Sequence, residues 1–91
     1  MDVAITRSER TEALLDGRVL PGALNVNWMS PPINEMFTRM LRGQDFAASE
    51  MSLTYAMLAL DLGEAPLVTL PVFLDRTFRH RDVYIRADGK I

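Results

Sequence analysis

The chain has 91 residues, of which 48% are hydrophobic and 24% are charged, and ten basic and twelve acidic side chains give it a formal net charge of −2. This length fits one small domain with a core of its own, and the composition excludes a disordered or low-complexity chain. The balanced charge provides no diffuse positive field for nucleic acid. Because the chain has no cysteine, disulfides, thiolate zinc sites and cysteine nucleophiles are excluded.

The sequence also bears on location and cofactors. Residues 1–7 lack the basic region, apolar run and small-residue cleavage site of an export signal, which predicts a cytoplasmic protein. No apolar run approaches the roughly 20 residues that cross a bilayer, so we expect no membrane insertion. The phosphate-loop and dinucleotide signatures are absent, and a single histidine without cysteine does not favour a metal site. We therefore expect neither a cofactor nor a metal.

The first third of the chain alternates between strand and helix patterns. Residues 2–7 alternate as a short strand does. Ser8 can cap a helix over residues 9–16, which Gly17 can end. Residues 24–29 alternate again and predict a second strand.

The next segment gives the clearest helix signal. Ser30 is suited to the N-cap, Pro31 to the first helical position, and Gly43 to the left-handed position after the last turn. Between them lies one apolar stripe at helical spacing, formed by Ile33, Met36, Phe37, Met40 and Leu41. We expect this stripe to face the core.

The second half continues the alternation. Residues 46–49 predict a third strand, and residues 52–62 predict a helix that ends at Gly63, with Leu53, Met57 and Leu60 facing inward. Residues 67–73 form an apolar run typical of a strand buried on both faces, which ends or bends at Pro71.

The C-terminal residues predict one more strand over residues 83–86 and a turn at residues 88–90. The order of elements indicates an α/β fold with a mainly parallel sheet flanked by helices. Such a sheet has an open edge, through which two copies of the chain could associate. Its ligands are expected beyond the carboxyl ends of the strands, next to the N-termini of helices.

Five stretches, taken together and in order, resemble the N-terminal portion of the 4,5-dihydroxyphthalate decarboxylase family. They are residues 10–19, 35–41, 49–53, 71–73 and 78–80. Members of that family are several-fold longer and have two lobes with a cleft between them. The resemblance implies that residues 1–91 form a single partial α/β domain, the first part of lobe one of a type II periplasmic-binding-protein-like fold.

The resemblance implies an activity as well: decarboxylation of a dihydroxylated aromatic dicarboxylate, such as 4,5-dihydroxyphthalate, to protocatechuate and carbon dioxide, without a cofactor. The 91 residues would supply one wall of the site. Two alternatives stay open. One is a small-anion solute-binding module of the ABC-transporter substrate-binding type, without catalysis. The other is a chain that folds only by pairing its open edge with another copy.

Three charged or titratable residues are the main candidates for this chemistry. His80, the only histidine, can exchange protons near neutral pH and is our candidate proton donor. Arg79 offers a planar fork for carboxylates, and Glu50 can act as a base toward a ring hydroxyl or hold His80 in one tautomer. The structural alternatives are a loop histidine, an arginine paired with Asp75 or Asp82, and a carboxylate that complements a helix dipole.

Three serines complete the predicted substrate-binding set. Ser49 and Ser52 flank the start of a predicted helix, and Ser8 follows the first strand. Each hydroxyl could donate to a carboxylate or ring oxygen, and each could equally cap a helix. Trp28 and Tyr55 could face an aromatic ligand, although an interior role fits each of them better.

Overall fold

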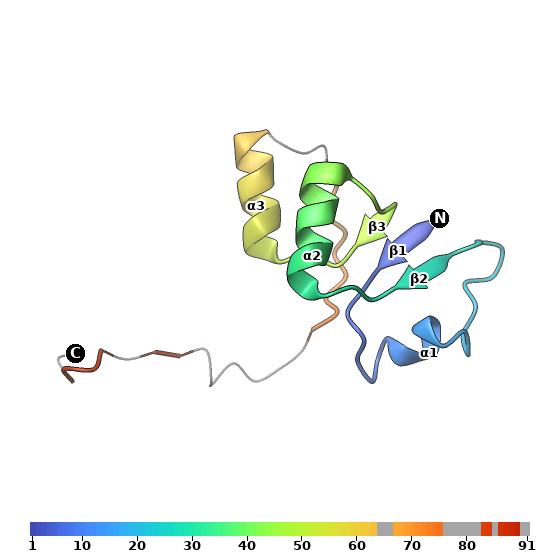
Figure 1. The fold of residues 1–91 in the computed structure, drawn as a ribbon, viewed down its shortest axis with the longest axis horizontal. Helices are drawn as coiled ribbons and strands as arrows, with labels where there is room; N and C mark the ends of the chain where they lie inside the picture. The colour runs from blue at the N-terminus through green and yellow to red at the C-terminus, as the bar shows by residue number, and fades with distance from the viewer. Residues whose placement is uncertain (64–66, 76–82, 85, 90–91) are drawn as a thin grey trace.

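The computed structural model describes residues 1–63, 67–75, 83–84 and 86–89. Its strands are β1 (Asp2–Ala4), β2 (Asn27–Met29) and β3 (Ala48–Ser49). Its helices are α1 (Glu12–Leu15), α2 (Ile33–Thr38), a π-helical turn η1 (Arg39–Gly43) that continues α2, and α3 (Leu53–Leu62). Strands and helices alternate along the chain (Figure 1), so the predicted α/β class is confirmed.

The three strands form a parallel sheet with β1 in the centre, in the order β2-β1-β3. Val3 lies opposite Trp28 on one side and opposite Ala48 on the other. The N–H of Ile5 donates to Met29 O at 3.0 Å and extends the ladder beyond β1. Because all three strands are parallel, their carboxyl ends lie along one edge of the sheet. From β1 the chain first adds β2 on one side and then β3 on the other, so the strand order reverses between β1 and β3, which is where open α/β sheets bind ligands.

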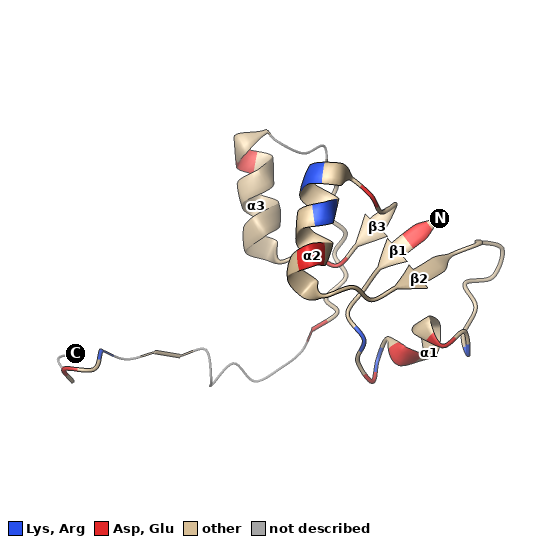
Figure 2. Ribbon diagram, in the orientation of Figure 1, with Lys and Arg blue, Asp and Glu red and all other residues tan. Residues whose placement is uncertain are grey.

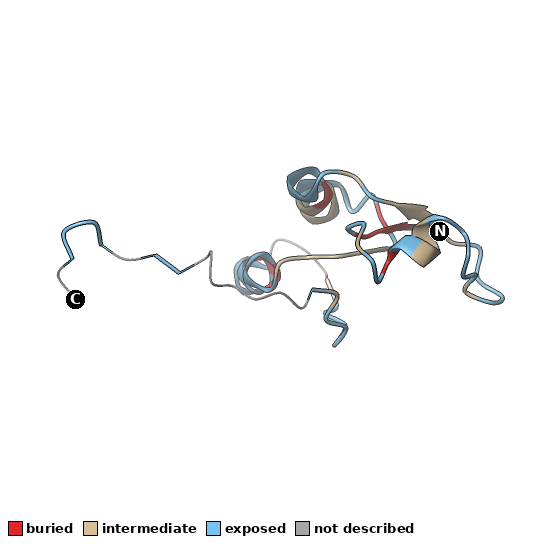
Figure 3. Ribbon diagram, turned by 90° about the horizontal axis from the view of Figure 1, so that it is seen from below, coloured by how far each residue is buried: buried red, intermediate tan, exposed pale blue. Residues whose placement is uncertain are grey.

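The core is centred on β1. Ala4, Met36 and Phe46 form a buried cluster, against which Met29, Phe37 and Met40 pack. Ala4 faces this cluster, and since side chains alternate along a strand, Val3 and Ile5 point to the other side of the sheet. Both are buried as well, so β1 is covered on both faces (Figure 3).

The helix that carries the apolar stripe starts and ends differently from the prediction. Pro32 occupies the N-cap with extended backbone (φ −52°, ψ 139°), and Ser30 does not cap. A residue before proline avoids the α region, so the Pro31-Pro32 pair delays the helix until Ile33. At the other end, η1 adds a residue to the last turn, and Gln44 (φ 52°), rather than Gly43, takes the left-handed position.

Four of the five residues of the stripe pack inward as predicted. Met36 is fully buried, and Phe37, Met40 and Leu41 are half-buried, whereas Ile33 in the first turn is exposed.

Helix α1 is shorter than predicted, because Ser8 does not cap it through its hydroxyl. The carbonyl of Ser8 accepts from the N–H groups of Thr11 (3.0 Å) and Glu12 (2.8 Å), which forms a turn before the helix. Gly17, with φ of 69°, follows the helix in the left-handed conformation as predicted.

Helix α3 begins one residue later than predicted, ends at the predicted residue, and buries a different face. Ser52 is at the N-cap, and Gly63 ends the helix with φ of 65°. The buried residues are Ala56 and Ala59, and not the predicted inward residues, which are exposed: Leu53, Met57 and Leu60. Figure 2 shows almost no charge on α3. A helix that is apolar on all sides has no polar face to indicate which side packs inward.

The predicted strand over residues 67–73 is absent. Val68 and Phe73 are 86% and 78% exposed, and no residue of this run is in a strand. Pro71 does bend the chain, since the N–H of Val72 donates to Leu70 O at 2.8 Å across it. In this γ-turn the N–H of Val72 is already used and Pro71 has none, so neither can donate to a neighbouring strand.

The last predicted elements have mixed outcomes. Val83, Tyr84 and Arg86 are not in a strand, and Val83 and Tyr84 are exposed, while residue 85 lies outside the described residues. The predicted turn is present up to Gly89, whose N–H donates to Arg86 O at 3.1 Å. In the described ranges, no helix is long and apolar enough to cross a membrane.

Candidate functional site

The carboxyl edge of the sheet, meaning the residues that follow β1, β2 and β3, is held together by the loop after β1. Three consecutive backbone N–H groups of this loop donate to side chains from three different elements. Thr6 donates to Glu50 Oε2 at 2.8 Å, Arg7 to Ser30 Oγ at 3.0 Å, and Ser8 to Thr11 Oγ1 at 2.8 Å. Thr6 and Arg7 are exposed and Ser8 is half-buried, and together the three hydrogen bonds tie this loop to the segments that follow β2 and β3 and to the start of α1.

Glu50 directly follows β3, at the point of the sheet edge where β3 lies beside β1. Its N–H donates to Ala4 O at 2.8 Å, and its Oε2 accepts from Thr6. Within the described part of the chain, Oε1 makes no hydrogen bond. The carboxylate is therefore oriented by the backbone and keeps one oxygen for a ligand or a further residue.

The serines of the carboxyl edge differ in what they can offer. The Ser49 hydroxyl donates to Glu50 O at 2.9 Å, so its hydrogen is already used. Ser52 occupies the N-cap of α3 without a side-chain capping bond, and its hydroxyl has no partner among the described residues. Ser8 is bonded to Thr11 through both its N–H and its hydroxyl.

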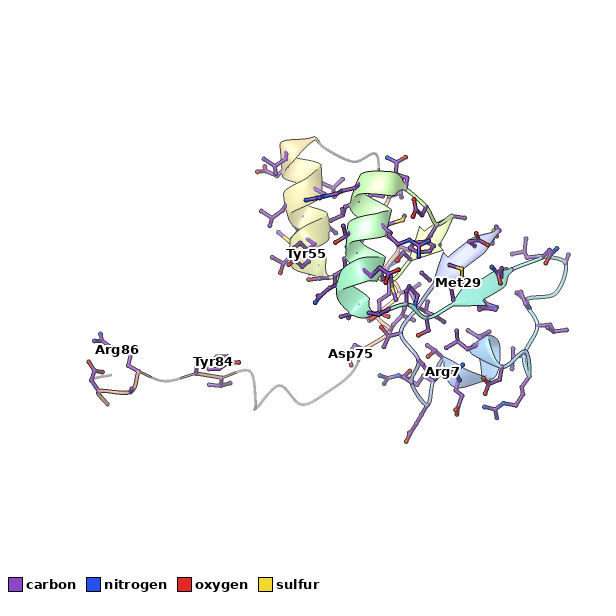
Figure 4. All side chains as sticks on the ribbon, in the orientation of Figure 1. Arg7, Met29, Tyr55, Asp75, Tyr84 and Arg86 are labelled. Carbon is purple, nitrogen blue, oxygen red and sulfur yellow. The ribbon has the colours of Figure 1, made fainter. Side chains whose placement is uncertain are left out.

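The guanidinium of Arg7 turns away from the edge and lies against α1 (Figure 4). It donates to Asp16 Oδ1 at 2.8 Å and lies 3.8 Å from Glu12 Oε1. The hydrogen bond with Asp16, followed by its charge, raises the pKa of Arg7 above the ordinary value for arginine. Arg7 contributes its backbone to the edge, while its charge is compensated elsewhere.

The two remaining predicted site residues, Arg79 and His80, lie outside the described residues. The segment that leads to them ends at Asp75, whose Oδ1 lies 3.9 Å from a guanidinium nitrogen of Arg10 in the turn between β1 and α1. Figure 4 labels Asp75 near this turn. The chain therefore returns to the β1 side of the molecule just before the basic stretch.

Two hollows are formed by the described residues, and Glu50, Ser8, Ser49 and Ser52 line neither of them. A hollow of about 330 Å³ lies between α1 and β2, and Trp28 is one of its walls; another of about 290 Å³ lies between α2 and α3. The indole N–H of Trp28 is buried without an acceptor in the described part of the chain. Tyr55 is half exposed and packs against Phe37, with 5.9 Å between the ring centroids and the rings tilted by 57°. Across the described ranges, no three acidic or histidine side chains gather to hold a metal ion.

Comparison with known proteins identifies the family. Over all 91 residues the chain is 33% identical to a 4,5-dihydroxyphthalate decarboxylase from Comamonas testosteroni and 32% identical to one from Pseudomonas putida. The chain belongs to the 4,5-dihydroxyphthalate decarboxylase family. It spans 28% and 35% of the lengths of these two relatives. No family model matches the chain, and no solved structure matches it, so the two-lobed fold stays a prediction.

Sequence reasoning missed two residues of the carboxyl edge, Thr6 and Thr11, and assigned another role to a third, Ser30. Thr6 contributes only its backbone, which no residue pattern indicates. Thr11 had a detectable signal, because a serine and a threonine three residues apart after a strand often bond side chain to backbone at the start of a helix. Ser30 was predicted, but as a helix cap.

Proposed function

We propose that this chain provides one wall of a site that decarboxylates a dihydroxylated aromatic dicarboxylate, with 4,5-dihydroxyphthalate as the model substrate and protocatechuate and carbon dioxide as products. The observation that carries the proposal is the match to two curated decarboxylases over the whole chain. The oriented carboxylate of Glu50 at the carboxyl edge supports it, because this is where open α/β sheets bind ligands.

The proposed chemistry needs a base and an acid on opposite sides of the ring. Glu50 takes the proton of a ring hydroxyl para to the departing carboxylate. The phenolate then raises the electron density at the carbon that bears this carboxylate, and His80 donates a proton to that carbon. The carbon–carbon bond breaks, its electron pair restores the aromatic ring, and carbon dioxide leaves. One proton enters the ring for each carboxylate lost.

Arg79 is the proposed anchor for the substrate carboxylates, and Ser52, Ser49 and Ser8 are the proposed contacts along the edge. Chain length permits this arrangement. Asp75 lies beside the β1–α1 turn, and the five residues from there to His80 can span up to about 18 Å.

The direct test is to incubate the 91-residue chain with 4,5-dihydroxyphthalate and to measure protocatechuate by chromatography and carbon dioxide by mass spectrometry. Stoichiometric formation of both products is expected. Tight binding without either product would favour the solute-binding alternative. A chain that neither binds the substrate nor forms product would reject both functions for these 91 residues on their own.

For His80→Gln, we expect turnover to be abolished and the dissociation constant for 4,5-dihydroxyphthalate to change by less than about threefold, since glutamine keeps the polarity but cannot supply a proton. Calorimetry and product analysis on the same preparation separate the two effects. Unchanged turnover would remove His80 from the mechanism.

For Arg79→Ala, we expect the dissociation constant for phthalate to rise by about tenfold or more, because a charge-assisted hydrogen bond to a carboxylate is lost. Binding of catechol, which has no carboxylate, is the internal control. Arg76→Ala is the matched control variant in the same basic stretch. Equal weakening of both ligands by Arg79→Ala would contradict the anchor role.

A further inference from the structure

The loop after β1 contains a buried hydroxyl with more partners than any other side chain of the carboxyl edge. Thr11 is 3% exposed, and its Oγ1 lies 2.6 Å from Thr6 O, 2.8 Å from Ser8 N and 3.1 Å from Ser8 Oγ. These three contacts can coexist in only one arrangement of hydrogens.

A hydroxyl has one hydrogen to donate and two lone pairs that accept. The carbonyl oxygen of Thr6 can only accept, so the Thr11 hydrogen points to it. The backbone N–H of Ser8 can only donate, so it uses one lone pair of Thr11. The second lone pair faces Ser8 Oγ, and the hydrogen between the two hydroxyls must therefore belong to Ser8. The longer contact of Thr11 Oγ1 with Ser8 O, at 3.4 Å, does not alter this result, because that oxygen is also a carbonyl.

The hydroxyl of Ser8 therefore has no hydrogen left for a ligand and presents only lone pairs. A carboxylate is itself an acceptor, so it gains nothing from Ser8 in this state. A phenolic hydroxyl is a donor and fits. We propose that Thr11 fixes Ser8 as a hydrogen-bond acceptor, and that Ser8 recognises the ring hydroxyls of an aromatic ligand rather than its carboxylates.

This proposal rests on the proposed function, since it assigns one end of the same dihydroxylated dicarboxylate. Ser52 is a useful contrast at the same edge, because its hydroxyl keeps its hydrogen. Thr11 is a positioning residue in this scheme, and Ser8 makes the contact.

The test compares two probe ligands, catechol and phthalate, which carry only the hydroxyls and only the carboxylates. Binding of each to the 91-residue chain is measured by calorimetry. We expect Ser8→Ala to weaken catechol by about tenfold and phthalate by less than about twofold, as one lost hydrogen bond would do. Thr38→Ala, which removes a hydroxyl that donates to Asn34 O within α2, is the matched control and should leave both ligands unchanged. Equal weakening of both ligands by Ser8→Ala, or no effect on catechol, would overturn the proposal while leaving decarboxylation untouched.

Thr11 itself is tested with Thr11→Val and Thr11→Ser. Valine removes the acceptor for the Ser8 hydrogen, so the ratio of catechol to phthalate affinity should fall by about tenfold, and serine should restore the ratio of the original chain. Hydrogen exchange of the Ser8 amide gives a readout without ligand: protection should be lost in Thr11→Val and kept in Thr11→Ser. Full protection of this amide in Thr11→Val would show that Thr11 does not hold the loop, and would overturn the proposal.

If the chain turns over 4,5-dihydroxyphthalate but the catechol to phthalate ratio does not respond to Ser8 or Thr11, only the present inference fails. If the chain binds neither 4,5-dihydroxyphthalate nor catechol, the proposed function fails and Ser8 has no ligand to recognise.

Discussion

At the scale of single residues, the hydrogen bond from Thr6 N–H to Glu50 Oε2 joins the ends of β1 and β3, which are 44 positions apart in sequence. The strands themselves are paired over only two residues here, Val3 with Ala48 and Ala4 with Ser49. A side chain that adds one more link to so short a ladder stabilises the pairing, and the same side chain is the proposed base. Stability and catalysis can be separated by two substitutions.

Glu50→Ala should lower the free energy of unfolding by about 1 kcal/mol, because a charged acceptor is lost and the Thr6 donor must find water. Glu50→Gln keeps an oxygen that accepts from Thr6, so its stability should stay close to that of the original chain, while its turnover is lost. Urea denaturation followed by tryptophan fluorescence measures the first effect and product analysis the second. Equal stability of all three chains would mean that the bond to Thr6 contributes nothing.

The residue types of the edge were predictable from sequence, but their hydrogen-bond roles were not. Ser8, Glu50 and Ser52 were predicted after strands or at the start of a helix, Ser49 was predicted as the last residue of a strand, and the structure has them there. Whether a serine donates or accepts depends on neighbours such as Thr11, which come together only in the folded loop. Contact between Glu50 and His80 remains a prediction, since His80 is outside the described residues.

At the scale of elements, the end of α2 shows how a π-helical turn shifts a stop signal by one residue. Gly43 fits the sequence pattern for the left-handed position, but Gln44 occupies it. Gly43 suits its position for another reason, because a Cβ there would contact the Asp45 carboxylate and displace it from its bond with Arg39 (2.8 Å). The sequence pattern therefore located the end of the helix to within one residue, but it assigned the left-handed conformation to Gly43 instead of Gln44.

Gln44→Gly should therefore stabilise the chain. Glycine adopts a positive φ without a steric cost, whereas a residue with a side chain loses about 1 kcal/mol in the left-handed region. Part of this gain is offset by the greater freedom of glycine in the unfolded chain. We expect a rise in melting temperature of a few degrees, measured by circular dichroism. Gly63→Ala, which forces alanine to φ of 65° in open space after α3, should lower it. A fall for Gln44→Gly would contradict the assigned conformation.

Helix existence was easier to predict than helix orientation. The stripe of α2 has a polar opposite side, and its inward face was predicted correctly at Met36. Helix α3 has leucines on several sides and a single charged residue, Asp61, so its residue pattern supports more than one inward face equally. The two buried residues, Ala56 and Ala59, are small and less hydrophobic than the exposed leucines. Hydrophobicity alone therefore does not predict which face of α3 packs inward.

At the scale of the whole molecule, much apolar surface beside the three-stranded sheet stays exposed. A parallel sheet of only three strands has two edges, and the apolar run at residues 67–73 was expected to extend it. That run is exposed, as are Leu58 and Leu62 of α3. Large exposed apolar surfaces favour association. Association of two copies through the sheet edge stays a prediction, and the relatives are about three times as long as this chain.

The remaining prediction concerns folding and binding together. A ligand that binds only the folded chain stabilises it, by about 1.4 kcal/mol when its concentration is ten times the dissociation constant. For a domain of this size we expect 4,5-dihydroxyphthalate to raise the melting temperature by about 6 °C or more. The transition is followed by circular dichroism with increasing ligand, and Arg79→Ala, which weakens the carboxylate anchor, should reduce the shift at every concentration.

The shape of the same transition decides what the carboxyl edge does without other protein. A cooperative transition that rises with ligand means that Glu50 and the loop after β1 are already arranged for binding in these 91 residues. A cooperative transition that ligand does not move would contradict the proposed site in this chain, because the edge would then be folded and yet unable to bind. A broad transition without a shift would mean that the short strand pairings of β1 do not hold the edge together, and that stable binding requires a longer polypeptide of this family.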